Sequence, residues 1–394
     1  MKQAKKLAAV LLSLVMLLAL VIPASAQIGE YSITINDTNS NHTYTAYQIF
    51  KGDISESDTE PGPYVLSNIK WGNGVKTDGL IDALRGVGDF AGLAEDATAA
   101  DVAELLTNAK ALDAFLNVIN RTPGFLAGAG TPATPETGED SCTIKLNEAG
   151  YYLIKDSLDE GTVGESVSDY IVQVLGQESV QPKESPIPNV EKKVQEDDKH
   201  TADDGYGAGY NDVADWDIGD SVPFKLIGSI PDMSAYDTYK YVFHDTLSAG
   251  LTLEAGSVNV YVVGTKNADL EVQTPLTSTT YSLATTGLDN GESFTITFNN
   301  LKTVKGAGEG KFIIVTYTAT LNDSAEIGLP GNPNEVYLEF SNDPNGDGTG
   351  KTTTDKVIVF TYELDGTKVD GEAITTTLPG AQFVLLNADG DKVA

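Results

Sequence analysis

One stretch of the chain, residues 181–194, contains a lysine whose expected surroundings point to chemistry. Lys192 lies in the alternating segment 190–194, Val-Glu-Lys-Lys-Val, which is typical of a β-strand, and a period of two places it on the same face as both valines. Valine favours the buried face of a strand, so we expect Lys192 to point into a core. A buried ammonium group is costly unless it is paired, neutralised or consumed in a reaction.

An acid and an asparagine are available further along the chain to meet this lysine. Asp245 has the parity of Tyr241 and Phe243, which predicts that its carboxyl group also faces the core. Asn334 and Asn342 flank a later strand candidate. A lysine, an aspartate and an asparagine could therefore share one interior.

These three groups could form a covalent crosslink. In a dry core, burial lowers the pKa of a lysine and raises that of an aspartate, so the proton can pass from the amine to the acid. The neutral amine can then attack a carboxamide that the protonated acid polarises, and ammonia leaves. Such a reaction needs no cofactor and happens once. The same pattern also fits a buried Lys–Asp ion pair beside a hydrogen-bonded asparagine, or side chains that face outward, and parity alone favours these alternatives.

Other chemistry has little support in the sequence. His42, His200 and His244 are scattered without metal-ligand spacing, and the acidic segment 342–348 lacks the glutamate of a calcium loop. No phosphate-binding loop and no Ser/His/Asp motif occurs. We therefore expect no metal, no cofactor and no multiple-turnover enzyme.

The first 26 residues have the features of a secretory signal peptide. Three lysines precede an apolar run over residues 7–22, and Ala24-Ser25-Ala26 is a small-residue cleavage site, so the mature chain is expected to begin near Gln27. An uncleaved membrane anchor is the alternative, but the run is short and ends in Pro23.

Loss of the three lysines takes the formal net charge from −32 to −35, which disfavours nucleic acid and anionic lipid as partners. The single cysteine cannot form an intrachain disulfide, so an exported chain needs another source of stability.

The expected fold is mostly β, with tandem immunoglobulin-like β-sandwich domains, the first of which carries an inserted α-helix. Residues 27–182 alternate as strands around an amphipathic helix at 98–120, and 183–188 form a Pro-rich linker. Residues 189–350 contain seven strand candidates separated by Gly, Asn and Asp turns, as in an immunoglobulin-like sandwich. Residues 356–394 begin a third β domain that stops early. In its opening segment Lys368 falls on the same alternate positions as the apolar residues, so we expect it to share their face of the strand.

The sequence resembles the major shaft pilins of Gram-positive bacteria, which class C sortases assemble. The resemblance covers most of the mature chain, and its Asp-Thr-Leu and Glu-Phe-Ser-Asn-Asp-Pro parts are fairly specific. The matching segments are 42–50, Trp71-Gly-Asn-Gly74, 190–194, Asp245-Thr-Leu-Ser-Ala-Gly-Leu251, Leu338-Glu-Phe-Ser-Asn-Asp-Pro344, and 362–381 with its Lys368-Val-Asp370 and Leu378-Pro-Gly-Ala381.

The resemblance implies two isopeptide-forming domains. The middle domain, 189–350, would have the collagen-adhesin (Cna) A-type fold, with an isopeptide bond from Lys192 to Asn334, or to Asn342 as the second choice, and Asp245 as the acid. A bond between the first and last strands would keep the intervening chain out of the path of force. The third domain would have the B-type fold with Lys368 as its bonding lysine, and its glutamate and asparagine lie beyond this sequence.

The resemblance also implies polymerisation. Shaft pilins expose a lysine in a Pro-Lys motif after the first domain, and sortase joins it to the C-terminal threonine of the next subunit. Lys183 occupies that place, although Gln181 stands where the family often has Tyr or Val. The implied partners are identical subunits and a class C sortase, with ancillary pilins and host ligands as further candidates, at the cell wall of a Gram-positive bacterium.

We therefore interpret the chain as a pilus shaft subunit. An ancillary pilin or cell-wall adhesin that binds a host ligand is the main alternative, because it would share these domains. A secreted enzyme with sandwich accessory domains would need a catalytic constellation that the sequence does not contain.

Overall fold

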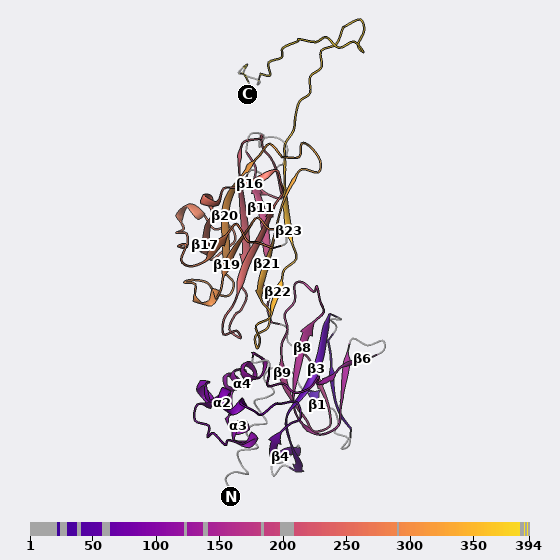
Figure 1. Ribbon diagram of the computed structural model, residues 1–394, viewed down its shortest axis with the longest axis vertical. Helices are drawn as coiled ribbons and strands as arrows, with labels where there is room; N and C mark the ends of the chain where they lie inside the picture. Colours follow the sequence, from indigo (N-terminus) through magenta and orange to yellow (C-terminus); the bar gives the residue numbers. More distant parts are fainter. Residues whose placement is uncertain are drawn as a thin grey trace.

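The computed structural model describes residues 22–23, 30–37, 41–56, 64–121, 124–136, 141–182, 185–197, 209–289, 291–386, 390 and 392. These residues form two β-rich domains placed end to end, and an extended C-terminal segment leaves the far end of the second domain (Figure 1). The α-helices of the described residues all lie in the first domain. The expected fold class, mostly β with several sandwich-like domains, is confirmed. The signal peptide falls outside the described residues except for Ile22–Pro23.

The first domain contains two sheets with a core between them. The first sheet has the order β1-β10-β2-β7-β6, and the second has the order β4-β3-β8-β9, with β5 paired to β3. Alternating apolar side chains of both sheets, such as Ile33, Ile144 and Ile154, form the shared core. The strands are β1 (Ile22–Pro23), β2 (Tyr31–Ile35), β3 (His42–Glu56), β4 (Tyr64–Trp71), β5 (Thr131–Pro132), β6 (Thr134–Pro135), β7 (Cys142–Leu146), β8 (Gly150–Leu158), β9 (Tyr170–Val174) and β10 (Gln177–Val180).

The helical insertion packs on the second sheet, where Phe50 and Leu153 meet Phe115 in a separate apolar core. It contains α2 (Leu80–Arg85), η3 (Gly88–Phe90), α3 (Ala99–Leu105) and α4 (Ala109–Arg121). The expected single helix at 98–120 is thus two helices. The break has a local cause, because the Asn108 side chain accepts a hydrogen bond from Ala111 N at 2.9 Å and starts a new helix.

The middle domain is a sandwich of two sheets. One has the order β12-β11-β14-β20-β16 with β17 also on β20, and the other has the order β13-β23-β21-β15-β19-β18 with β22 also on β21. Their inner faces form one large apolar core. The strands are β11 (Val190–Gln195), β12 (Tyr210–Asn211), β13 (Val213–Asp215), β14 (Ser221–Ser229), β15 (Tyr241–Leu247), β16 (Leu251–Leu253), β17 (Asn259–Val263), β18 (Ser282–Ala284), β19 (Phe294–Phe298), β20 (Phe312–Leu321), β21 (Asn332–Ser341), β22 (Thr349–Lys351) and β23 (Asp355–Phe360), with short 3-10 turns η4 (Ala255–Ser257), η5 (Leu270–Val272) and η6 (Leu301–Thr303).

The expected boundary between the second and third domains, at 350–356, was wrong. β23 lies between β13 and β21, so it is the last strand of the middle domain rather than the first strand of a third one. Val357 and Val359 point into the core. The expected inward position of Lys368 required the residues that alternate with these valines to point inward instead. After β23 the chain is extended, and Lys368 is exposed.

The two domains contact each other through the loop that joins β8 to β9. In this loop Gly164 N donates to Lys351 O at 2.6 Å, and Val167 N donates to Asn342 O at 2.8 Å. Ser166 Oγ donates to Ser185 O at 2.7 Å beside the expected linker. Backbone hydrogen bonds therefore hold the first domain against the end of the middle domain.

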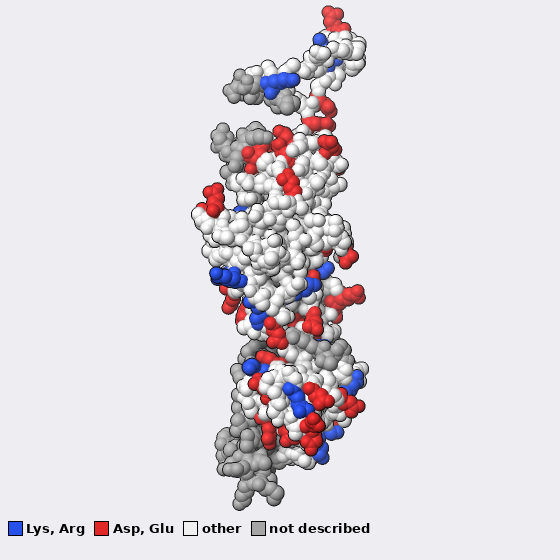
Figure 2. All heavy atoms as spheres, turned by 60° about the vertical axis from the view of Figure 1, so that its left-hand side comes forward, with Lys and Arg blue, Asp and Glu red and all other residues white. Residues whose placement is uncertain are grey.

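The surface agrees with the acidic composition. On the face shown in Figure 2, acidic side chains are spread over both domains, and the described lysines and arginines form no continuous patch. Among the described residues no helix has the length and apolar character needed to cross a bilayer.

Candidate intramolecular crosslinking site

Lys192 is buried in the core of the middle domain, as its parity predicted. Burial alternates along β11, and Val190, Lys192 and Val194 all face inward. The lysine is paired with Leu226 of β14, and none of its surface is exposed. A charged side chain of this length in an apolar interior needs a partner from the facing sheet.

Asp245 and Asn334 supply that partner from the facing sheet. In the antiparallel pair β15–β21, Asp245 is opposite Val336 and Leu247 is opposite Asn334. Asp245 and Asn334 are therefore diagonal neighbours on one face. Both are completely buried, and Lys192 Nζ donates a hydrogen bond to Asp245 Oδ2. The structure thus brings together the lysine, the acid and one of the two expected asparagines.

A tyrosine that sequence reasoning missed connects the acid to the asparagine. Tyr317, on β20, donates to Asp245 Oδ2 at 3.0 Å and accepts from Asn334 Nδ2 at 2.8 Å. Its ring stacks on Phe224 with centroids 5.3 Å apart, and Lys192 Nζ lies 5.7 Å from the Tyr317 centroid. The alternation of 312–321 places Tyr317 on the inner face, so period two could have identified it.

Burial moves the pKa values of the acid and the lysine toward each other. Desolvation lowers the pKa of Lys192 to about 8, against the opposing charge and hydrogen bond of Asp245. Desolvation also raises the pKa of Asp245, although Lys192 and Tyr317 oppose the shift. Because both shifts favour neutral groups, the proton can move from the ammonium group to the carboxylate.

Two buried oxygens of this site have no hydrogen-bond partner in the described part of the chain, Asp245 Oδ1 and Asn334 Oδ1. Each is an acceptor that costs about 1–3 kcal/mol when buried and unpaired. A proton on the Asp245 carboxyl group would turn an acceptor into a donor. The carboxamide oxygen of Asn334 is the group that an acid must polarise before an amine attacks the adjacent carbon.

The other predicted site residues lie elsewhere. Asn342 follows the end of β21 and is roughly 25 Å along the strand from Asn334, at about 3.3 Å per residue. It lies at the contact with the first domain, where its carbonyl accepts from Val167 N. Lys368 is exposed in the C-terminal segment, and Lys183 lies outside the described residues. Asn334 also lies on β21, so the expected bond would not reach the last strand, which is β23.

The histidines of the described residues contact carboxylate groups rather than forming metal clusters. His244 Nδ1 lies 2.9 Å from Glu292 Oε1, and its ring stacks on Tyr337 with centroids 4.5 Å apart. No group of three metal-ligating side chains occurs within the described ranges.

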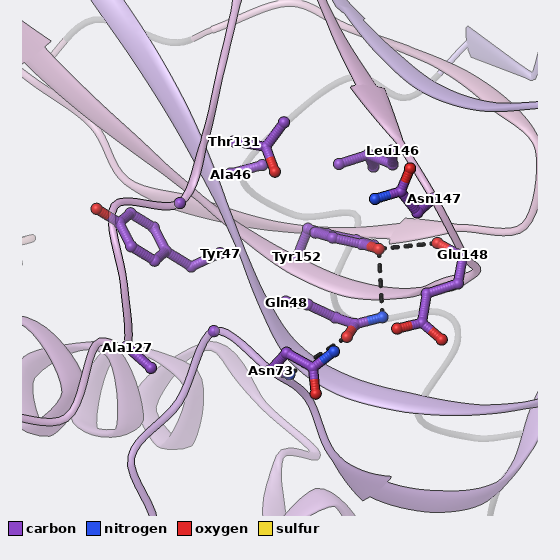
Figure 3. A pocket seen from close by; sticks show the side chains of 12 residues that line it. Ala46, Tyr47, Gln48, Asn73, Ala127, Thr131, Leu146, Asn147, Glu148 and Tyr152 are labelled. Carbon is purple, nitrogen blue, oxygen red and sulfur yellow. Dashed lines mark hydrogen bonds between the residues drawn. The ribbon is translucent and has the colours of Figure 1, made fainter.

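A polar pocket of about 250 Å³ lies in the first domain (Figure 3). The Gln48 amide donates to the Tyr152 hydroxyl at 3.2 Å, and its oxygen accepts from Asn73 N at 3.3 Å. Glu148 is the one carboxylate in the lining, and no histidine, cysteine or lysine contributes. The pocket therefore offers neither a nucleophile with a base nor a pair of carboxylates for catalysis.

Residues 218–344, most of the sandwich that holds this site, match the protein family described as Gram-positive pilin backbone subunit 2, Cna-B-like domain. This part of the chain is therefore similar to a Gram-positive pilin backbone domain. The chain is similar to the trypsin-resistant surface T6 protein of Streptococcus pyogenes serotype M6, with 26% identity over 233 residues. That match covers 56% of this chain and 39% of the relative, so the chain spans about two fifths of the relative's length.

One solved backbone pilin structure shares the fold. The T6 backbone pilin of Streptococcus pyogenes, described as a modular three-domain structure, superposes with a TM-score of 0.58 and 19% identity, covering 94% of this chain and 72% of that one. The major pilin SpaD of Corynebacterium diphtheriae gives a TM-score of 0.48 and 15% identity, covering 91% and 72%.

The matched family is described as a Gram-positive pilin backbone subunit, in agreement with the resemblance found in the sequence. The cell-surface location and the non-enzymatic role stay predictions. The family description is Cna-B-like, whereas we expected an A-type middle domain. The A-type assignment stays a prediction.

Proposed function

We propose that this pilin is a shaft subunit of a covalently polymerised pilus, and that Lys192 and Asn334 of its middle domain form an isopeptide bond. The observation that supports the proposal is the buried set Lys192, Asp245, Tyr317 and Asn334, in which the acid contacts the lysine directly and the asparagine through the tyrosine. Asp245, Tyr317 and Asn334 lie within residues 218–344, which match the pilin backbone family, and Lys192 lies on a strand before them.

The bond would form in three steps. The Lys192 ammonium group gives a proton to Asp245, which leaves a neutral amine in an interior where water is excluded. Nζ then attacks Cγ of Asn334 while the protonated acid polarises the carboxamide oxygen, and Tyr317 holds the amide nitrogen. Asp245 finally transfers a proton from the attacking nitrogen to the leaving one, so that ammonia departs and an amide remains.

The position of the bond suits a protein under tension. Lys192 belongs to one sheet of the sandwich and Asn334 to the other, so the crosslink would join the two sheets. It would bypass the chain between residues 192 and 334 when the subunit is pulled. In the chain-entropy treatment of crosslinks, closing a loop longer than about 100 residues stabilises the fold by roughly 5 kcal/mol. Unlike a disulfide, the amide cannot be reduced.

Polymerisation completes the proposal. Lys183 would accept the C-terminal threonine of a neighbouring copy in a reaction catalysed by a class C sortase, and copies would join head to tail. Ancillary pilins and host ligands are further candidate partners.

The intact mass of the mature chain, residues 27–394, tests the crosslink. We expect the wild type to lack one ammonia that the Lys192→Ala, Asp245→Ala and Asn334→Ala variants retain, after correction for each substitution. Asn342→Ala is the matched control and should behave as the wild type. The complete chain is needed because β23 contributes Val357 and Val359 to the core. Equal corrected masses for the wild type and Lys192→Ala would refute the bond.

A further inference from the structure

The pocket of about 250 Å³ in the first domain has a floor that hydrogen bonds hold in place (Figure 3). Gln48, which is buried on β3, donates through Nε2 to Ala149 O at 3.3 Å and to the Tyr152 hydroxyl at 3.2 Å. The Tyr152 hydroxyl in turn donates to Glu148 O at 2.8 Å. The hydrogens of the Gln48 amide and of the Tyr152 hydroxyl are therefore already used within the protein.

The two side chains of the floor offer acceptors to a ligand rather than donors. Gln48 Oε1 accepts one hydrogen bond, from Asn73 N at 3.3 Å, and an amide oxygen has two lone pairs. The Tyr152 hydroxyl oxygen accepts one hydrogen bond, from Gln48, and also has a second lone pair. A ligand that fits this floor must therefore present hydrogen-bond donors, such as hydroxyl or amino groups.

Backbone contacts with β3 hold the walls of the pocket in place. Gly74 N donates to Gln48 O at 2.9 Å, and Ala127 N donates to Gly74 O at 2.9 Å. Gly130 lies so close to β3 that a Cβ atom at this position would stand 2.5 Å from Thr45 Cγ2. The walls are thus formed before a ligand arrives, and a preformed site lowers the entropic cost of binding.

The lining of the pocket disfavours anionic ligands. None of the described residues that line it is a lysine or an arginine, and Glu148 contributes an exposed carboxylate. Next to it, the exposed amide of Asn147 supplies donors and an acceptor. The formal net charge of −32 also repels phosphate and carboxylate groups. These features together favour a neutral ligand that carries several hydroxyl groups.

We propose that this pocket binds one hexopyranose ring of a polysaccharide or glycan chain. Sugar hydroxyl groups both donate and accept, so they can donate to Gln48 Oε1 and the Tyr152 oxygen at the floor and bind the Asn147 amide at the rim. The Tyr47 ring, which also lines the pocket, offers an apolar face to the C–H groups of the sugar. Pockets for drug-sized ligands measure about 300–1,000 Å³, so a volume of about 250 Å³ suits a smaller ligand of this kind.

The pocket is separate from the domain junction and from the proposed crosslink. The first-domain residues whose hydrogen bonds reach the middle domain, among them Gly164, Val167 and Asn117, do not line it. The inference therefore goes beyond the proposed shaft role and does not depend on a bond at Lys192. A polymer of these subunits would present one pocket per subunit, and multivalent contact with a polysaccharide would make weak single sites effective.

Saturation-transfer NMR on the mature chain, residues 27–394, tests the inference with the methyl glycosides of glucose, galactose, mannose and N-acetylglucosamine as probes. We expect at least one of them to bind with a Kd on the order of 1 mM, as a ligand of about a dozen non-hydrogen atoms allows. Thr131→Trp places a large side chain at an exposed position of the lining and should abolish the signal. Thr134→Trp, exposed on β6 and outside the lining, is the matched control and should bind as the wild type does. Asn147→Ala should weaken binding about fivefold, as expected for the loss of one hydrogen bond.

A lack of signal from every glycoside, or a signal that persists in Thr131→Trp, would overturn the sugar site. Methylamine is the second probe, because Glu148 could instead attract a cation. Binding of methylamine but of no glycoside, with loss of that binding in Glu148→Gln, would show an amine site and overturn the proposal. Soluble fragments of bacterial wall polysaccharide and oligosaccharides released from host glycoproteins then distinguish the two sources of the sugar. Binding of either one, with loss in Thr131→Trp, supports the proposal, and binding of neither overturns it.

Discussion

A fully buried lysine is tolerated in the middle domain because Asp245 can accept either its hydrogen bond or its proton. Removal of one partner from a buried ion pair typically costs 3–5 kcal/mol, about as much as several good contacts contribute. An ion pair alone would not explain Asn334, whose carboxamide oxygen is buried without a partner. At the scale of single residues, the proposed reaction would explain why the lysine, the acid and the asparagine are buried together.

Tyr317 should control how readily they react. In Tyr317→Phe the Asn334 amide loses its acceptor and Asp245 loses a donor, so the chain that has not yet crosslinked should be destabilised by about 1–3 kcal/mol. A less firmly oriented carboxamide should also be attacked more slowly. Intact-mass measurements over time would follow the loss of ammonia. Tyr362→Phe is the control, because that ring is 71% exposed. Crosslinking of Tyr317→Phe at the wild-type rate would contradict this role.

At the scale of elements, the β8–β9 loop depends on a histidine. His42 Nδ1 lies 2.8 Å from Asp156 Oδ1, and His42 Nε2 lies 3.1 Å from Glu165 Oε2. Only the Nδ1 contact has hydrogen-bond geometry, and Nε2 has no hydrogen-bond partner in the described part of the chain. Asp156 Oδ2 also accepts from Ser168 N at 3.1 Å. The carboxyl group of Asp156 therefore connects His42 to the end of the loop that contacts the middle domain.

The stability of the first domain should depend on the protonation of His42. Burial lowers the pKa of this histidine, but the hydrogen bond and charge of Asp156, with Asp37 and Glu165, outweigh burial and raise it above 6.5. A raised histidine pKa stabilises the fold fully below the unfolded value, and this contribution is lost as pH rises through the folded pKa.

Urea unfolding of the wild type and of His42→Gln, from below pH 6.5 to well above it, checks this expectation. The free energy of unfolding of the wild type should decrease across that window, and the decrease should be absent from His42→Gln. Parallel pH dependences in the two proteins would show that the histidine does not fasten the loop.

At the scale of the whole molecule, the domains follow one another along a single axis, and the C-terminal segment leaves at the end opposite the first domain (Figure 1). Force applied along the chain would cross the junction and then the middle domain. The proposed Lys192–Asn334 bond spans both sheets of that domain. The expected polymerisation lysine, Lys183, falls between the two domains in sequence, so each new subunit would attach beside the junction.

Polymerisation should require Lys183 and not the internal bond. In cells that contain the complete pilin and its sortase, Lys183→Ala should abolish the ladder of covalent multimers in cell-wall extracts. Lys192→Ala should keep the ladder, although its subunits should be more sensitive to protease because the crosslink is lost. A ladder that persists in Lys183→Ala would contradict the assignment of this lysine. The absence of a ladder in the wild type would favour an ancillary pilin or adhesin.

The alternation of single strands was visible in the sequence. A period of two predicted that Lys192 and Asp245 face a core, and both are buried. The same rule could have found Tyr317. The rule failed at residues 356–368. There we assumed that one strand alternation continues past the end of β23, and this assigned the wrong residues to the core. Parity describes one strand and does not say to which sheet the strand belongs.

The sequence by itself determined the mostly β class and the inward lysine, because composition and local periodicity carry that information, and it predicts secretion from the first 26 residues. Only the tertiary structure places Asn334, and not Asn342, beside Asp245, because the two asparagines share parity and it is the register of β15 against β21 that separates them. Likewise, the hydrogen bonds from Asn120 and Lys155 to Asp169 join a helix, a strand and a loop, so no local pattern relates these residues. Strand register and the packing of helix on sheet are set by contacts distant in sequence, and a single chain without its fold does not reveal them.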